Sequence, residues 1–129
     1  MPVARRGYTL IELLFVLVII ALLVGIALPK YQVSKTRAYV RAMESDLRNV
    51  MAVQATYVTS GNSYTADLTA LNFGPTKGNT LSIPEATANG WIARVTNPGA
   101  AGVECVVFVG TVGTATSPAT TEGKITCVP

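Results

Sequence analysis

The chain has 129 residues, of which 50% are hydrophobic and only 13% are charged, and its formal net charge is +3. This length predicts a single domain, and such a small net charge argues against nucleic-acid binding as the main function. Histidine is absent, which removes the most common general base and metal ligand.

A long apolar run near the N-terminus is the most informative feature. From Tyr8 to Leu28 the only charged residue is Glu12. A helix over this run would be about 30 Å long, enough to cross the hydrocarbon core of a bilayer. A carboxylate in such a segment costs a few kcal/mol on insertion scales. We therefore expect Glu12 to have a specific partner.

Two general interpretations compete for this segment. A secretory signal peptide would use Arg5 and Arg6 as its basic region and Gly25-Ile26-Ala27 as a small-residue cleavage site. The length of the apolar run, the proline just beyond it and the early position of Glu12 argue against that interpretation. An uncleaved single-span anchor is the second alternative, but it requires no glutamate.

The residues around Glu12 follow a specific order. They read Gly7-Tyr8-Thr9-Leu10-Ile11-Glu12-Leu13-Leu14. This order closely resembles the processing signature of type IV pilins and related pseudopilins. The resemblance implies that prepilin peptidase removes a leader peptide, residues 1–7, by cutting between Gly7 and Tyr8. It also implies that Tyr8, where the family commonly has phenylalanine, is N-methylated and that Glu12 becomes the fifth residue of the mature chain. Loss of Arg5 and Arg6 would leave a net charge of about +1, before the new amine is counted.

Cleavage would create an α-amino group at Tyr8, beside the apolar run. In a low-dielectric helix bundle this amine and Glu12 would neutralise each other, and the resemblance implies that the amine comes from a neighbouring subunit. A pair within one chain, one helical turn apart, remains open on geometry alone. Removing one partner of a buried ion pair is strongly unfavourable. We therefore expect Glu12 and Tyr8 to set the register of subunit assembly, while apolar packing supplies the binding energy.

The helix is predicted to continue beyond the apolar run, to about Ser60. Pro29 removes a hydrogen bond and bends a helix, so Gly25 and Pro29 are expected to mark a weak point. Helical periodicity then resumes over 30–60 and predicts an amphipathic half whose apolar face packs on a following sheet. Two rows form that face: Val33, Val40 and Leu47, and Met43, Val50 and Tyr57. Gly61 is suited to the turn that ends the helix.

Residues 61–129 are predicted to form a small head. A short helix is expected over Thr65–Leu71, and Thr114–Thr121 is expected to be an exposed loop. Asn97-Pro98-Gly99 is expected to turn between strands. Strand-like segments are Leu81–Ile83, Trp91–Thr96, Cys105–Val109 and Lys124–Val128.

The two cysteines, Cys105 and Cys127, are expected to form a disulfide in an exported head. The chain-entropy model gives such a closure about 3 kcal/mol. Two buried free thiols remain the alternative. Basic residues lie on both sides of the span, since Lys30, Lys35 and Arg37 follow it, so the distribution of charge does not fix the orientation in the membrane. The expected disulfide favours a head outside the cytoplasm.

The arrangement of these elements is similar to the pilin fold, an α+β fold in which a long N-terminal helix packs on a small antiparallel sheet. The resemblance implies four regions: the leader 1–7, a transmembrane and assembly helix 8–29, an amphipathic half 30–60 and a globular head 61–129. It further implies a homo-oligomeric helical filament, prepared by prepilin peptidase, extruded by an ATPase-driven assembly machine and drawn from a single-pass precursor pool in the inner membrane. The extracellular filament would serve motility, adhesion or DNA uptake.

No catalytic constellation, metal-ligand spacing or phosphate loop is visible, so we expect no enzyme activity, no metal and no cofactor. Two alternatives to a pilus subunit remain: a pseudopilin of a type II secretion system, and a minor pilin that acts as a binding module. Lys77, Arg94 and Lys124 are too few to support DNA binding.

Overall fold

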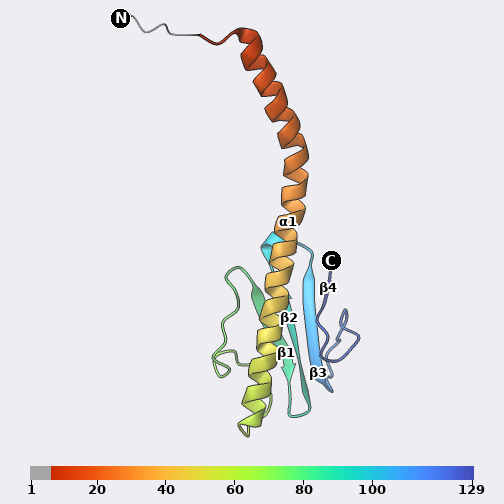
Figure 1. The fold of residues 1–129 in the computed structure, drawn as a ribbon. Coiled ribbons are helices and arrows are strands. Elements are labelled where there is room, and N and C mark those ends of the chain that lie inside the picture. The colour runs from red at the N-terminus through yellow and green to blue at the C-terminus, as the bar shows by residue number, and fades with distance from the viewer. Residues whose placement is uncertain (1–6) are drawn as a thin grey trace, which may run out of the picture. The chain divides into compact units, whose positions relative to one another are not determined.

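The computed structural model describes residues 7–129 and has an α+β fold with one long helix and one antiparallel sheet (Figure 1). The helix, α1, covers Leu10–Thr59 and includes Pro29. The other elements are β1 (Thr80–Ala86), β2 (Gly90–Thr96), the short 3-10 helix η1 (Pro98–Ala100), β3 (Glu104–Gly110) and β4 (Thr126–Val128). The predicted fold class is confirmed.

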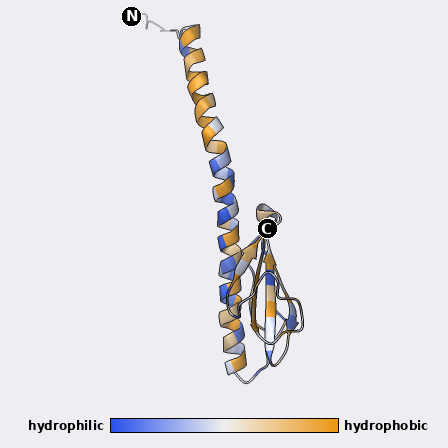
Figure 2. Ribbon diagram, turned by 90° about the vertical axis from the view of Figure 1, so that its right-hand side faces the viewer, coloured by the Kyte–Doolittle hydropathy of each residue, from blue (hydrophilic) through white to orange (hydrophobic). Residues whose placement is uncertain are grey.

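The chain divides into two units, Met1–Ser34 and Lys35–Pro129. The first unit contains the N-terminal part of α1, where hydrophobic residues follow one another almost without interruption (Figure 2). The second contains the rest of α1 and the whole sheet. The first unit therefore has no sheet against which to bury its apolar side chains.

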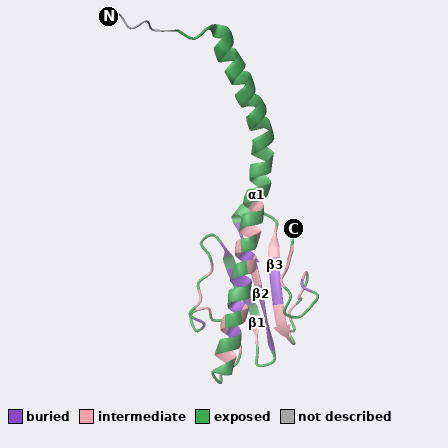
Figure 3. Cartoon of the chain, viewed as in Figure 1, coloured by how far each residue is buried: buried purple, intermediate pink, exposed green. Residues whose placement is uncertain are grey.

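In the second unit, one face of α1 forms the core with the sheet. Met43, Leu47 and Val50 are spaced at three and four residues and are fully buried (Figure 3). They belong to one cluster with five residues of β2 and β3: Trp91, Ala93, Val95, Cys105 and Val107. The predicted apolar rows are thus confirmed here, with Val40 and Tyr57 partly buried against the cluster. Val33 is 52% exposed, because it lies in the unit that lacks the sheet.

The sheet is a simple antiparallel meander in the order β1-β2-β3-β4. β1 is longer than predicted because it continues through Pro84: the register shifts between Ser82 and Glu85, and this irregularity accommodates a residue without an amide hydrogen. β4 is shorter than predicted. Gly123 has a positive φ of 71° and the Lys124 amide donates to the Thr121 carbonyl, so a turn precedes the strand.

The predicted helix at Thr65–Leu71 is wrong, because this segment consists of turns. The Thr65 hydroxyl accepts from the Asp67 amide, only two residues ahead, and the Asp67 carboxylate accepts from the Thr69 amide. These short-range bonds satisfy the amides locally and compete with a helical ladder. The end of α1 agrees with the prediction: Gly61 has a φ of 90° and its amide donates to the Val58 carbonyl.

A buried polar network links α1 to the loop before β1 and to the β2–β3 connection. The Asp46 carboxylate is 3% exposed and accepts from the Thr76 amide at 2.9 Å, the Thr76 hydroxyl at 2.7 Å and the Asn79 side-chain amide at 2.6 Å. Asn79 in turn accepts from Asn97, whose side-chain oxygen accepts from the Gly99 amide. Each polar group is satisfied, so the network fixes the loop without leaving a buried charge unpaired.

The C-terminal loop covers the second face of the sheet. Ala119 is 1% exposed and packs with Ile92 and Val106, with Phe108 and Val112 beside them. The expectation of a fully exposed loop over Thr114–Thr121 is therefore wrong at this position. A single small side chain is hard to recognise as a core residue in a stretch of threonine, serine and alanine, which is why composition misled the prediction.

Candidate assembly surface

The first turn of α1 is held by a reciprocal cap between Thr9 and Glu12. The Glu12 amide donates to the Thr9 hydroxyl oxygen at 3.2 Å. Glu12 Oε2 accepts from the Thr9 amide at 2.8 Å and from the Thr9 hydroxyl at 3.0 Å. This is a capping box, and it explains why the helix begins at Leu10 and not at the predicted Tyr8.

Sequence reasoning missed Thr9, although its signal was present. The order Thr-x-x-Glu directly before an apolar run is the sequence signature of a capping box. The partner of Glu12 in this structure is therefore the start of its own helix. The Tyr8 amine with which Glu12 is expected to pair would exist only after the predicted cleavage, so that pairing stays a prediction.

Tyr8 and Glu12 line one surface hollow of about 470 Å³, together with Leu13, Phe15 and Val16. Tyr8 is 89% exposed. Gly7 precedes the helix and has no neighbouring atoms within 4 Å of the position that a Cβ would occupy. The structure thus brings three residues of the predicted processing and assembly site together at the start of α1. The other six residues of the predicted leader, including Arg5 and Arg6, lie outside the described residues.

The apolar run presents its side chains outward on all sides. The most apolar part of α1 is long enough to cross a membrane and has no residue buried within the chain. Its large hydrophobic side chains from Leu10 to Leu28 are all exposed by more than 40%. A surface of this kind requires a lipid or protein partner.

Gly25 and Pro29 lie within an unbroken α1. Because Pro29 has no amide hydrogen, it cannot donate to the carbonyl of Gly25, four residues before it. The continuous helix therefore has one missing bond at this step, and Gly25 adds backbone freedom at the same place. Both residues keep the role of a predicted weak point.

Cys105 and Cys127 form a disulfide that joins β3 to β4 at directly paired positions. The alternative of two free thiols is wrong. Cys127 Sγ also lies 3.8 Å from Glu44 Oε1 on α1. The disulfide thus fixes a strand of only three residues, Thr126–Val128, to the central part of the sheet.

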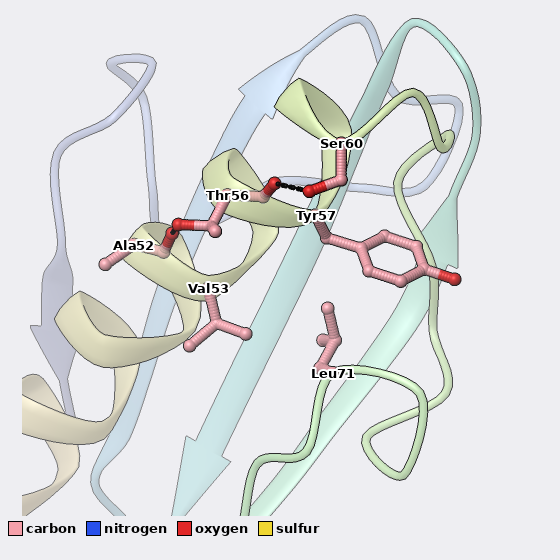
Figure 4. Close-up of a pocket in the computed structure, with 6 residues that line it drawn as sticks. All are labelled: Ala52, Val53, Thr56, Tyr57, Ser60 and Leu71. Atoms are coloured by element: carbon pink, nitrogen blue, oxygen red, sulfur yellow. Dashed lines mark hydrogen bonds between the residues drawn. The ribbon is translucent and has the colours of Figure 1, made fainter.

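The other candidate residues of the head do not form a site. Arg94 donates to Glu104 at 3.0 Å and to the Ala115 carbonyl at 2.5 Å, so it holds the C-terminal loop. A hollow of about 320 Å³ lies at the end of α1 (Figure 4), lined by Ala52, Val53, Thr56, Tyr57, Ser60 and Leu71. Its Thr56 and Ser60 hydroxyls donate to helix carbonyls. Within residues 7–129 there is no group of three acidic, cysteine or histidine side chains able to hold a metal ion.

Comparison with known proteins identifies the same N-terminal region. The family model for the prokaryotic N-terminal methylation motif matches residues 3–28. The chain is 36% identical over 90 residues to the type IV wide pilus major component PilA4 of Thermus thermophilus, covering 67% of this chain and 69% of that protein. It is 29% identical over 107 residues to the type IV major pilin protein PilA of Myxococcus xanthus, covering 79% of this chain and 48% of that protein. The chain therefore belongs to the type IV pilin family.

Proposed function

We propose that this pilin is the structural subunit of a type IV pilus, and that it polymerises through its N-terminal apolar helix into an extracellular helical filament. The observation that carries the proposal is the apolar run of α1, which is exposed on every side and contains one carboxylate. Copies of the same helix provide the surface that covers it, and contacts between copies that do not close into a ring give a filament.

A major subunit is favoured over a minor one. Both relatives carry that description in their names, as a major component of a wide pilus and as a major pilin. The same names favour a pilin over a pseudopilin of a secretion system. Arg94 is engaged within the head, which gives no support to a DNA-binding tip module.

Processing comes before assembly in this proposal. Prepilin peptidase removes residues 1–7 by cutting between Gly7 and Tyr8, and Tyr8 is then N-methylated. Gly7 lies outside the helix, with open space around it, so a peptidase can reach it. The precursor waits in the inner membrane as a single-span protein with regions 8–29, 30–60 and 61–129 acting as anchor, amphipathic helix and head.

Glu12 is suited to serve both the stored and the assembled subunit. Its Oε2 atom accepts both bonds from Thr9, and within residues 7–129 its Oε1 atom accepts no hydrogen bond. One oxygen therefore caps the helix, while the other can accept a hydrogen bond from the charged Tyr8 amine of a neighbouring subunit. The ion pair then forms without a loss of the cap.

Replacing Glu12 tests the proposal in cells that carry the variant as their only copy of the pilin. Glu12→Ala should be produced, cleaved and stored in the membrane, but few filaments should appear by electron microscopy, because the Tyr8 amine is left buried without a partner. Glu12→Asp should be intermediate, since the charge remains with a shorter reach.

Two control variants separate pairing from other roles. Thr9→Val removes the cap hydroxyl while the carboxylate stays, so filaments should persist if pairing is the essential role. Glu44→Gln removes a carboxylate elsewhere on α1, where it forms a 3.5 Å ion pair with the exposed Arg48, and should also leave filaments in place. Filaments in wild-type numbers on Glu12→Ala cells would contradict the pairing.

A further inference from the structure

Four basic side chains follow the apolar run on α1: Lys30, Lys35, Arg37 and Arg41. All four are exposed, and none of them belongs to an ion pair within residues 7–129. Glu12 and Glu44 are the nearest acidic residues along the chain, and Glu44 pairs with Arg48 at 3.5 Å. The segment therefore carries four positive charges outside any ion pair.

Arg37 and Arg41 lie one helical turn apart and line the same surface hollow of about 390 Å³. Thr36, Val40 and Glu44 provide the rest of its wall, and Glu44 is paired with Arg48. Two guanidinium groups at this spacing present planar forks of N–H donors on one face of a helix. That arrangement suits the oxygens of a phosphate group, which arginine binds in a bidentate manner.

The position of these residues along α1 indicates where the phosphates would be. Lys35 follows Leu28 by about two helical turns, which corresponds to a rise of about 10 Å, and Arg41 by fewer than four turns, about 20 Å. Helical side chains lean toward the N-terminus of the helix, so their charged ends lie closer to the apolar run than their backbone does. The headgroup layer is about 5–8 Å deep on each side of a bilayer, and electrostatic attraction extends about 8–10 Å further.

The charge of this segment opposes the orientation that the disulfide requires. Lysine and arginine close to a span favour the cytoplasmic side of the membrane. Cys105 and Cys127 are bonded, which requires an oxidising compartment and places the residues after the span on the other side. Four basic residues kept on the unfavoured side need a compensating partner there.

A second copy of the chain would have to share carboxylates that are already hydrogen-bonded or ion-paired within their own chain. Every acidic side chain of the unit Lys35–Pro129 already has a partner within its own chain. Glu44 and Glu104 accept from arginines, Asp46 from Thr76 and Asn79, Glu85 from Gly113 and Thr114, Asp67 from the Thr69 amide and Glu122 from the Gly110 amide. A lipid phosphate is not already bonded to a group of the protein.

We propose that Lys30, Lys35, Arg37 and Arg41 bind the phosphates of anionic phospholipid headgroups at the outer surface of the membrane that stores the precursor. The contact fixes the depth at which the span lies in the membrane, and it is released when the subunit leaves the membrane. This inference rests on the proposed membrane storage.

The test uses the full-length chain reconstituted with a mixture of phosphatidylglycerol and phosphatidylcholine. After mild detergent extraction, mass spectrometry measures the ratio of the two lipids retained by the protein. Wild type should enrich the anionic lipid about fivefold, the effect of roughly one well-placed basic residue at an anionic surface, and salt should reduce the enrichment. The fourfold variant, with Lys30→Gln, Lys35→Gln, Arg37→Gln and Arg41→Gln, should retain the lipids in their bulk ratio.

The control compares two double variants that remove the same charge. Arg37→Gln with Arg41→Gln should weaken the enrichment, whereas Lys77→Gln with Lys124→Gln, at exposed positions of the second unit, should keep it. Among single variants the loss should be largest for Lys30 and then decrease from Lys35 to Arg37 to Arg41, following distance from the apolar run. Equal losses in the two double variants would show an effect of net charge alone and overturn the proposal.

Two further outcomes also decide between explanations. If the fourfold variant keeps the wild-type lipid ratio but loses self-association in phosphatidylcholine alone, the cluster serves a second copy of the chain and the lipid proposal is wrong. Flotation of the reconstituted protein on a density gradient tests storage separately. A chain that fails to float with vesicles overturns the proposed membrane storage together with this inference, whereas a chain that floats without lipid preference overturns the inference alone.

Discussion

Leu17 and Leu47 lie in the same helix, yet their side chains are 59% and 0% exposed. Leu47 packs in the core that α1 forms with the sheet. Leu17 has no such partner, because the described part of its unit, residues 7–34, holds no strand and no element other than α1. The comparison shows that leucine stabilises the fold of the subunit in one region and is left exposed in the other, where the proposed filament would use it for cohesion between subunits.

Replacing each leucine by alanine sharpens this comparison, and Leu47→Ala should give the largest effect on the fold. It should lower the free energy of unfolding by about 2–5 kcal/mol, because the cavity forms in a fully packed core. Urea unfolding in detergent, followed by the fluorescence of Trp91, measures this. Trp91 is the single tryptophan and is 1% exposed. Leu17→Ala should leave that transition unchanged and reduce filament number. A matching loss of unfolding free energy in Leu17→Ala would contradict the division of roles.

The disulfide should act only on the second unit. Cys105→Ala with Cys127→Ala should lower the free energy of unfolding by about 3 kcal/mol, since the unfolded chain regains the entropy that the closure removes. Membrane insertion should be unchanged, as measured by flotation. Reductant added to wild type should reproduce the shift. An unchanged midpoint in both experiments would show that β3–β4 pairing holds the C-terminus without covalent help.

Disrupting the buried polar network at Asp46 should cause the next largest loss of unfolding free energy. Asp46→Ala removes a shared acceptor and leaves the Thr76 amide and the Asn79 side chain without their partner, which costs about 1–3 kcal/mol. Asp46→Asn should be intermediate because one acceptor oxygen remains. Asp67→Ala, at an exposed turn, provides the control and should change stability little. Denaturant unfolding of the three variants in parallel checks this order.

The smallest expected effect is the loosening of the loop beyond β3 at low pH. The Gly113 amide, followed by the Thr114 hydroxyl and amide, holds the pKa of Glu85 below its ordinary value of 4.5. A lowered pKa means that the carboxylate stabilises the loop fully above about 4.5, and that this contribution is lost as the pH falls through the lower pKa of the folded state. The protection of the Gly113 and Thr114 amides, measured relative to their intrinsic exchange rate at each pH, should therefore fall in acid. In Glu85→Gln this protection should not change with pH; a fall that persists in Glu85→Gln would assign the effect to another group.

Much of the fold was predictable because its signals are periodic. The apolar rows of α1 identified Met43, Leu47 and Val50 as core, and strand-like runs located β2 and β3 within a residue of each end. Pro84 hid the full length of β1, since its accommodation depends on a register shift with the neighbouring strand. No local pattern reports such a shift.

The sequence indicated which residues belong to the candidate site, but it did not indicate which atoms they contact. The importance of Glu12 was clear from the pilin-like motif. Its bond to Thr9 follows from a second signature in the same residues, the capping box Thr-x-x-Glu. Gly99 gives a similar case in the head. It resembles an ordinary turn glycine, but a Cβ there would collide with the ring of Tyr39. Long-range contacts of this kind cannot be deduced from neighbours in sequence.

The loop over Ile92 and Val106 buries the methyl group of Ala119, while Thr120 beside it faces solvent. Other residues attach the loop to the sheet: Arg94 donates to the Ala115 carbonyl, and Glu122 accepts from the Gly110 amide. Because these contacts lie on either side of residue 120, a fluorophore coupled there would be carried on the head without disturbing the sheet. The loop therefore provides a place to label this subunit and to follow it during the proposed assembly.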